Sequence, residues 1–397
     1  MKSLKQLYKI GYGPSASHSM GPAYAVKIFK KSHPSAKSYK AILYGSLALT
    51  GKGHLTDQAI IKNFYPSECI VEFDLKSTNI KHPNTFDLLA YYDTKIVKTR
   101  FYSIGGGDLE IEGYDKPLYE DIYPHNNYTS LKKYLTDNNI SIVDYVKTYE
   151  GDDIVEYLTH MYEHMVETIN NGLNKEGYLP GELKVVRKAK EIYNTKLVDE
   201  SLLEKKEVYA YAFAVSEENA SGEEIVTAPT CGSCGLLPAV LYHCQNKYKY
   251  SDEKIVEALM VAGIIGNIVK TNASISGAEA GCQAEIGTAT SMAAAAYAYL
   301  IGANLNEIEI AAEAALEHLL GLTCDPIKGY VQIPCIERNA VCAIRAIDAG
   351  KLAIFIKPNN SKISFDTVVR TMLKTGKDLN SKYRETAKGG LAKEYKI

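Results

Sequence analysis

Tryptophan is absent from this sequence, and long blocks of a single charge sign are missing as well. The 30 tyrosines are scattered along the chain and form no stacking platform for nucleic-acid bases. The formal net charge of only -2 gives no electrostatic footprint for nucleic acid or for an anionic membrane. We therefore expect neither nucleic acid nor a membrane as a partner.

Long apolar segments are also missing. The start of the chain has no apolar core of the kind that marks a secretory signal. The most apolar stretch, Ala258 to Ile265, is far shorter than the roughly 20 residues of a membrane span. Without an export signal, eight cysteines are typical of a reducing cytoplasm, where thiols are free, metal-bound or catalytic. Seven of them fall between Cys231 and Cys342, so we expect a cytoplasmic protein whose chemistry lies in that region.

The pattern of the chain changes after its first third. Up to about Ile111, short segments rich in β-branched and aromatic residues are bounded by turn residues, which predicts strands. Later segments have helical periodicity, and the run Ala293–Ala296 predicts close helix–helix packing. We predict an α+β protein, with an α/β domain at 1–130 and an all-helical domain at 140–397. The polar, turn-rich segment Leu118–Asn139 marks the junction between them.

A Ser/His-rich loop stands directly before a helix whose first turn is marked by Pro22. The start of a helix offers free backbone N–H groups and a positive dipole. Ser15, Ser17, His18 and Ser19 are therefore candidates to surround a bound carboxylate. The alternative interpretation is that these residues only cap the helix.

A second Gly/Ser/Thr-rich loop contains Cys231 and Cys234 as a C-x-x-C pair. This pair is consistent with a thioredoxin-like redox site, with half of a metal site, or with two small residues that happen to be cysteine. A second C-x-x-C for a four-thiolate zinc site is missing, and no histidine pair follows at zinc-finger spacing.

Three further cysteines, Cys282, Cys324 and Cys335, lie in loops shaped by glycine or proline. Backbone N–H groups in such loops are free to donate to sulfur, which stabilises the thiolates of metal clusters. Buried structural cysteines lie more often in the middle of helices, as Cys244 and Cys342 do in the expected helices. The spacing of the three loop cysteines does not by itself identify a particular metal.

Eight segments of the sequence match a known family in the family's own order. In the small domain these are Gly13–Pro22, Gly45–Asp57, His82–Thr85 and Ser103–Gly107. In the large domain they are Leu179–Ala189, Ala228–Gly235, Asn272–Gly287 and Gly321–Ala340. Through these segments the chain resembles the iron–sulfur-dependent L-serine dehydratases (L-serine ammonia-lyases), in the single-chain form with the small domain first.

The resemblance implies a [4Fe–4S] cluster bound by Cys282, Cys324 and Cys335, without pyridoxal phosphate. It also implies an oxygen-sensitive lyase of amino-acid degradation and gluconeogenesis, active as a homodimer. The small domain would have an ACT-like, allosteric-substrate-binding topology, and the large domain would be all-helical. Positions 231 and 234 depart from the family, which usually has small or amide residues there. The C-x-x-C pair therefore indicates a local variation of a substrate loop rather than a cluster motif.

Serine dehydration removes the α-hydrogen and the β-hydroxyl, and a cluster with three protein thiolates leaves one iron open to polarise that hydroxyl. His18 is the candidate base, because imidazole titrates in the right pH range. Ser15, Ser17 and Ser19 would hold the substrate carboxylate. Further substrate contacts are expected from Thr230, Ser233 and Asn272, with Glu279 and Glu285 as additional candidates for the ammonium or for ordering the cluster.

Other interpretations remain open at the level of sequence. A lyase of the same family acting on L-threonine or L-cysteine differs only in its pocket, which the sequence does not show. A regulatory amino-acid-binding protein is opposed by the intact cysteines and His18. A dithiol oxidoreductase using Cys231 and Cys234 leaves the other cysteine loops unexplained. His54 and His82 lie in matched small-domain segments, where an effector or domain-contact role competes with simple turn structure.

Overall fold

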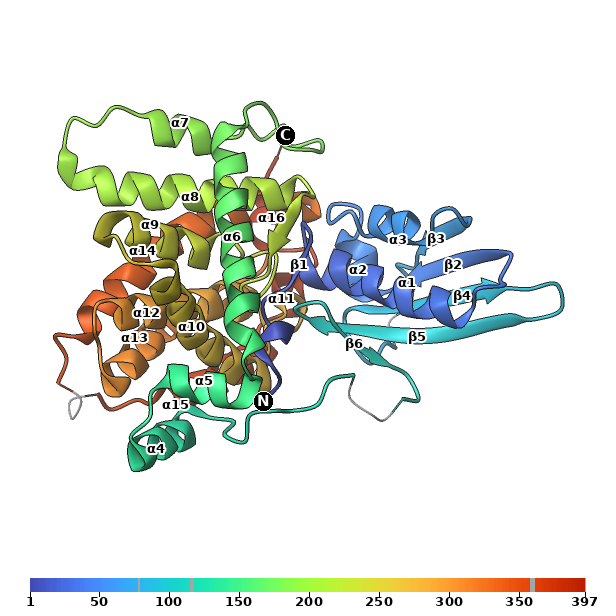
Figure 1. Cartoon of the computed structure of the whole chain (residues 1–397). Helices are drawn as coiled ribbons and strands as arrows, with labels where there is room; N and C mark the ends of the chain where they lie inside the picture. Colours follow the sequence, from blue (N-terminus) through green and yellow to red (C-terminus); the bar gives the residue numbers. More distant parts are fainter. Residues whose placement is uncertain (78, 115–117, 358–360, 397) are drawn as a thin grey trace.

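The computed structural model describes residues 1–77, 79–114, 118–357 and 361–396. A small domain with a mixed sheet projects from a larger, mostly helical domain (Figure 1). The predicted α+β class is confirmed, with the small domain first.

The small domain is a five-stranded sheet with helices packed on one face. Its strands are β2 (Ser38–Leu43), β3 (Cys69–Phe73), β4 (Thr85–Tyr91), β5 (Ile96–Gly105) and β6 (Asp108–Ile111), and its helices are α1 (Gly21–Ser32), α2 (Gly45–Thr50) and α3 (Thr56–Phe64). The strand order is β3-β2-β4-β5-β6, with β2 and β3 parallel and the other pairs antiparallel. Phe29 of α1 and Phe64 of α3 are buried against the sheet with Phe86 and Phe101. This apolar layer holds α1 and the loop before it in place.

The helical domain surrounds a nearly fully buried central helix, α12. The helices are α4 (Tyr128–Asn138), α5 (Ile142–Glu150), α6 (Asp153–Asn174), α7 (Ala189–Asn194), α8 (Leu203–Ala220), α9 (Leu236–Tyr248), α10 (Asp252–Asn272), α11 (Gly277–Ala280), α12 (Thr288–Leu300), α13 (Leu305–Glu317), α14 (Cys335–Ala353), α15 (Phe365–Asp378) and α16 (Gly390–Glu394). The run Ala293–Ala296 in α12 has no exposed surface, which confirms the predicted close packing. Gly350 of α14 lies so close to α12 that an added Cβ would be 2.6 Å from the Tyr297 ring.

Helix α10 is the one helix in the described ranges that is long and apolar enough to cross a membrane. Of its most apolar window, 78% is buried inside the structure. It contains the apolar stretch singled out in the sequence. This degree of burial is typical of the core helix of a globular domain.

The first residues of the chain pack with the helical domain rather than with the sheet. Leu4 and Tyr8 belong to the large hydrophobic core, and the Tyr8 hydroxyl donates to the Leu259 carbonyl at 2.9 Å. Strand β1 (Ile10–Tyr12) pairs antiparallel with β7 (Glu224–Val226). The helical domain therefore also contains a strand, and the chain enters the small domain only at the loop before α1.

The two domains also meet through a buried carboxylate. Asp108 of β6 is 3% exposed, and its oxygens lie 2.6 Å from Lys9 Nζ and 2.8 Å from Lys270 Nζ. Both lysines belong to segments packed into the helical domain. The two ion pairs hold the pKa of Asp108 below its ordinary value against the opposing effect of burial.

We expect Asp108→Ala to destabilise the domain junction by about 3 kcal/mol, because it leaves largely buried lysines without their counter-charge. Urea unfolding followed by circular dichroism will measure the effect as an earlier first transition. The surface substitution Asp93→Ala, which removes an exposed ion pair with Lys37, is the control and should change stability by less than about 1 kcal/mol. Equal effects of the two substitutions would contradict a structural role for Asp108.

Candidate active site

The loop before α1 turns its polar side chains into the protein. It forms a π-helical turn in which Ser15 Oγ accepts a hydrogen bond from the backbone N–H of His18 at 3.1 Å. The Ser15 and Ser17 hydroxyls lie 3.3 Å and 3.1 Å from His18 Nδ1. Ser19 Oγ donates to the carbonyl of His54 at 2.9 Å. All three serines and His18 are buried, so the loop forms an interior polar site at the junction of the domains.

The hydrogen bonds around His18 identify its tautomer. Ser46 Oγ donates to the backbone carbonyl of Glu385 at 2.7 Å, and Thr50 Oγ1 donates to the Ser46 carbonyl at 2.9 Å. Each hydroxyl has a single proton, so both oxygens can only accept from His18 Nε2, which lies 3.1 Å from each. Assigned from this network, the ring proton is on Nε2, and Nδ1 is unprotonated and can accept a hydrogen bond from the Ser15 or Ser17 hydroxyl.

His18 is neutral near pH 7. Burial lowers the pKa of its imidazole to about 4, although the nearby Glu385 carboxylate acts in the opposite direction and His54 adds to the lowering. The His18 and His54 rings are stacked, with centroids 4.3 Å apart. A neutral imidazole with an unprotonated ring nitrogen has the form required of a general base.

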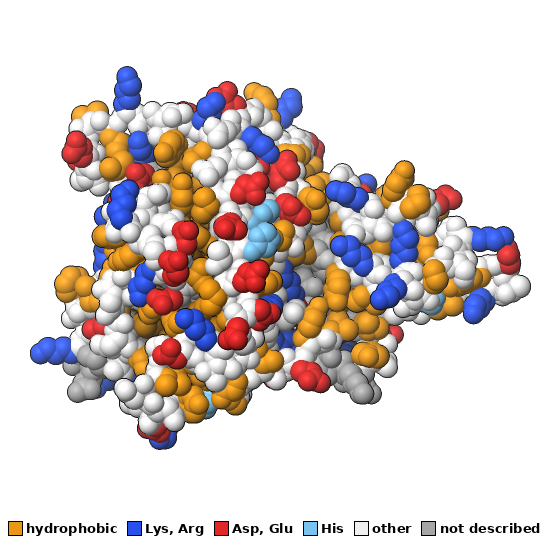
Figure 2. Space-filling model, viewed as in Figure 1, with side chains coloured by type: hydrophobic (Ala, Val, Ile, Leu, Met, Phe, Trp, Pro, Cys, Tyr) orange, Lys and Arg blue, Asp and Glu red, His pale blue; other side chains and the backbone are white. Residues whose placement is uncertain are grey.

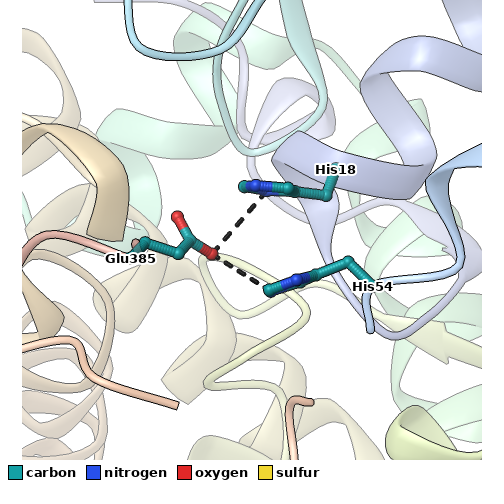
Figure 3. Close-up of side chains that lie close together, drawn as sticks. All are labelled: His18, His54 and Glu385. Atoms are coloured by element: carbon teal, nitrogen blue, oxygen red, sulfur yellow. Dashed lines mark ion pairs between the residues drawn. The ribbon is translucent and has the colours of Figure 1, made fainter. Parts of the chain in front are cut away.

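Glu385 comes from near the end of the sequence and faces both histidines. Its Oε1 lies 3.7 Å from His18 Nδ1 and 3.3 Å from His54 Nε2 (Figure 3). Its backbone N–H donates to the carbonyl of Cys324 at 2.8 Å, which ties this segment to a cysteine loop. Burial acts to raise the pKa of Glu385, but the two imidazoles and the backbone N–H of Ala278 together outweigh it, so the pKa lies below its ordinary value and the group is a carboxylate.

The backbone at Glu385 is in the left-handed region, with φ of 54°. This conformation is uncommon for a residue other than glycine and is maintained here by the surrounding hydrogen bonds. Nothing in the linear sequence around position 385 indicated a site residue. The carboxylate reaches the histidines only because the chain folds back against the Cys324 loop, where Cys324 and Arg384 form an isolated parallel bridge.

Three cysteine loops converge beside Glu385. The Cys282 and Cys324 thiols lie close enough to shift each other's pKa, and Cys335, at the start of α14, interacts electrostatically with Cys282. The neighbouring Cys324 thiol, together with the Arg338 guanidinium, lowers the pKa of Cys282 to about 6 despite its burial. Arg338 is positioned by its hydrogen bond to the carbonyl of Thr323 at 2.7 Å. Soft sulfur ligands gathered from three loops, with a cation that stabilises thiolate, fit a metal or iron–sulfur site.

The loop after β7 lines the same region from the other side. Thr230 Oγ1 donates to Glu285 Oε1 at 2.8 Å and lies 3.1 Å from the Ser233 hydroxyl. Burial, with a contribution from Glu385 and Cys282, raises the pKa of Glu285 well above its ordinary value. One oxygen each of Glu285 and Glu385 and the Cys324 sulfur lie within 4.8 Å of one another. The structure thus brings the Thr230 loop to the cysteine loops and the histidines.

Cys231 and Cys234 are buried in this loop, and within the described ranges no hydrogen bond links either of them to Cys282, Cys324 or Cys335. The Cys231 thiol donates to Met20 Sδ at 3.3 Å, and burial raises the pKa values of both thiols. Both are therefore neutral thiols near pH 7, without the electropositive surroundings that activate a redox pair. Their geometry agrees with an apolar packing role behind the loop.

Two other candidates from the sequence have their partners elsewhere. Asn272, at the end of α10, donates through its amide to the carbonyls of Ile268 and Asn126. The Glu279 carboxylate accepts from Ser274 Oγ at 2.6 Å and lies beside a cavity that contains His82. The described side-chain hydrogen bonds of Asn272 and Glu279 do not include His18 or His54, nor do they include Cys282, Cys324 or Cys335.

A cavity of about 680 Å³ adjoins the site where the two domains meet. It is bordered by Ser19 and Met20 of the loop before α1 and by the cations of Lys9, Lys27 and Lys62. No acidic side chain lines it within the described part of the chain. Acidic and basic side chains are otherwise interspersed over the face shown in Figure 2. The cavity gives a locally positive approach for an anionic group.

A mixed-sheet domain set on a helical domain, with a buried base and three thiols at their junction, defines a two-domain α+β enzyme. Comparison with known families is consistent with this: the serine dehydratase beta chain matches residues 3–69, and the serine dehydratase alpha chain matches residues 70–392. The chain belongs to the serine dehydratase family and is a lyase.

The similarity extends over whole proteins. The chain is 38% identical to the L-serine dehydratase of Haemophilus influenzae and to L-serine dehydratase 1 of Escherichia coli, with 99% of both chains covered in each case. It is 39% identical to the L-serine dehydratase of Helicobacter pylori, again with 99% of both chains covered. The family to which the sequence motifs pointed is confirmed.

Proposed function

We propose that the protein is an L-serine ammonia-lyase of the cytoplasm, which converts L-serine to pyruvate and ammonium. The observation that carries the proposal is the junction of His18, Glu385 and Cys324. Glu385 Oε1 lies 3.7 Å from the unprotonated Nδ1 of His18, and one of its oxygens lies within 4.8 Å of the Cys324 sulfur, so this carboxylate connects the base with the thiols. The names of the similar proteins from H. influenzae and E. coli give the same substrate.

We propose that Cys282, Cys324 and Cys335 hold a [4Fe–4S] cluster. When bound, such a cluster supplies a Lewis acid that assists departure of the substrate's β-hydroxyl, a poor leaving group near neutral pH. Arg338 supports the set by stabilising the thiolate form of Cys282. The protein contributes the remaining chemistry, which is removal of the α-hydrogen and positioning of the amino acid.

His18 Nδ1 is the base in this proposal. It takes the α-hydrogen as a proton, the electron pair forms the Cα–Cβ double bond, and the β-hydroxyl leaves as hydroxide. Return of the proton from the imidazolium to the hydroxide gives 2-aminoacrylate and water and restores the neutral base. The enamine tautomerises to an imine, and water hydrolyses the imine to pyruvate and ammonium. The protonated ring would retain its Nε2 hydrogen bonds to Ser46 and Thr50 and gain stabilisation from the Glu385 carboxylate.

The substrate carboxylate has a natural place at the loop before α1. Ser15 and Ser17 present hydroxyls next to His18, and the cavity with Lys9, Lys27 and Lys62 lies beside the same loop. Thr230 and Ser233 would face the amino acid from the helical domain. This arrangement requires both domains for a complete site, as is common for sites at domain junctions.

The proposed function is tested by anaerobic purification and a pyruvate assay with L-serine, before and after exposure to air. We expect a brown protein that releases pyruvate and loses activity in air together with its visible absorbance. A colourless, iron-free protein with full activity would refute the cluster. L-threonine and L-cysteine, assayed in parallel, should have lower kcat/KM values than L-serine.

The acid limb of the pH profile should reflect the low pKa of His18. A base acts only when deprotonated, and a pKa of about 4 keeps His18 deprotonated well below the ordinary imidazole range. The charged and titratable groups facing it are Glu385 and His54. We expect kcat/KM for serine to change by less than about twofold between roughly pH 5.5 and pH 7, and to fall as pH drops toward the pKa.

Initial rates measured within the lifetime of the visible absorbance at each pH will separate titration of the base from loss of the cluster. A tenfold fall for each unit below roughly pH 6.5, with the absorbance unchanged, would show an ordinary imidazole as the base and contradict this assignment.

A further inference from the structure

One carboxylate oxygen of Glu385 is buried without a hydrogen-bond partner in the described part of the chain. The residue is 4% exposed, and its Oε1 contacts both histidines. Its other oxygen, Oε2, has no hydrogen-bond partner within the described ranges of the chain. In Figure 3 this oxygen points away from both rings. An unpartnered buried carboxylate oxygen costs free energy, so its retention indicates a ligand that donates to it.

A second carboxylate lies at the same place. Glu285 reaches within 4.8 Å of Glu385 and of the Cys324 sulfur, and its only described hydrogen bond is the one from Thr230. No lysine or arginine lies within ion-pair distance of either glutamate in the described ranges. Glu385 is therefore a buried carboxylate whose only basic neighbours in the described ranges are His18 and His54, and Glu285 beside it is held in its neutral form by its raised pKa.

A glycine allows these groups to come together. A Cβ at Gly277 would lie 2.9 Å from Glu285 Oε2 and 3.1 Å from Cys324 Sγ, closer than a Cβ ordinarily approaches other atoms. The lack of a side chain at Gly277 therefore lets Glu285 and Cys324 pack directly against the backbone. Together with Glu385 they form one acidic recess beside the proposed base.

We infer that Glu385, assisted by Glu285, is the binding site for the α-ammonium group of the substrate. A primary ammonium provides the three N–H donors and the positive charge that this recess lacks. The inference rests on the proposed function, because it assigns a contact to the amino acid that this site would take. Glu385 is thereby a substrate-binding residue as well as the partner of the two histidines.

This placement also orients the reaction. An ammonium on Glu385 Oε2 would be held by the same carboxylate whose Oε1 lies 3.7 Å from His18 Nδ1. One carboxylate would thus position the substrate and the base relative to each other.

The test uses ligands that cannot react. L-alanine has the carboxylate and the ammonium of serine but no hydroxyl to lose, and propionate lacks the ammonium. Isothermal titration of the anaerobic holoenzyme should show L-alanine binding at least about 100-fold more tightly than propionate, the difference typical of a buried charged pair. Equal affinities in the wild-type protein would overturn the inference without reference to any variant.

The variant Glu385→Gln keeps the size of the side chain and removes its charge. We expect it to weaken L-alanine binding by about 100-fold and to change propionate binding by less than about threefold. Glu313→Gln, a buried glutamate on α13 whose pKa burial raises to about 8, is the matched control and should leave both affinities unchanged. Alanine affinity within threefold of wild type in folded Glu385→Gln would overturn the inference.

Two further outcomes are distinguishable. If replacing choline chloride in the buffer by potassium chloride weakened L-alanine binding tenfold, potassium would compete for the recess. The recess would then be a site for an inorganic cation, and the inference would be wrong. If alanine binds as expected but L-serine yields no pyruvate, the ammonium site stands and the proposed reaction fails.

Discussion

Replacing Cys324 by alanine is expected to abolish iron binding and serine turnover together. The Cys324 sulfur neighbours Cys282 and lies within 4.8 Å of carboxylate oxygens of Glu285 and Glu385, so it connects the thiols with the proposed base. Loss of one of three protein ligands should lower metal affinity by more than about 100-fold, beyond the effect of changing a group that merely supports a ligand. Turnover should fall by more than about 10³-fold, because the leaving hydroxide then lacks its Lewis acid.

Iron content per chain, visible absorbance and pyruvate release will be measured on the same anaerobic preparations. Cys234→Ala is the matched control, since Cys234 is also a buried loop cysteine but has no described contact with the other three. It should retain iron and most of the activity. Loss of iron from Cys234→Ala with retention in Cys324→Ala would show that the proposed ligand set is wrong.

Replacing His18 by alanine should separate the base from the cluster. We expect kcat to fall by about 10³-fold, within the range found for general-base residues, with iron content and visible absorbance unchanged. Nδ1 of His18 is the unprotonated ring nitrogen and faces only the exchangeable hydroxyls of Ser15 and Ser17, because Nε2 donates to Ser46 and Thr50. The His54 ring faces the oxygens of Thr50 and Glu385.

A purely structural role for His18 is distinguished by rescue. Added imidazole should restore part of the activity of His18→Ala, since a free base can enter the space left by the ring, and it should not affect the wild-type enzyme. His243→Gln, which changes a buried histidine paired with Glu207 far along the sequence, serves as the control with unchanged kcat. Turnover of His18→Ala at the wild-type rate would remove His18 as the base.

Periodicity and propensity were sufficient for the class of fold. The strand-forming segments of the first third formed the mixed sheet, and the helical segments after the junction formed the large domain. The reason is that side chains repeat every two residues in a strand and about every 3.6 residues in a helix, so each pattern of apolar residues fits only one of the two structures. The run Ala293–Ala296 was correctly interpreted as close packing, since small side chains let helices approach. The all-helical description missed β7, a three-residue strand whose partner is more than two hundred residues earlier in the chain.

The site shows a different balance between sequence and structure. The loop motifs named His18 and the three cysteines, but Glu385 had no local signal and His54 had an undecided role. Ser46 and Glu385, which share a hydrogen bond, are 339 positions apart. No pattern of spacing along a chain reports a contact at such a separation. The path of the last residues against the Cys324 loop creates it.

The sequence by itself determined the α+β class, the family and the chemistry that its motifs allow, because periodicity and residue type are properties of the chain. Only the tertiary structure decided which nitrogen of His18 carries the proton, which acid faces the ring and which side chains lie outside the site. Those properties depend on burial and on the direction of individual hydrogen bonds. Both arise when distant segments are brought into one interior where water no longer satisfies their polar groups.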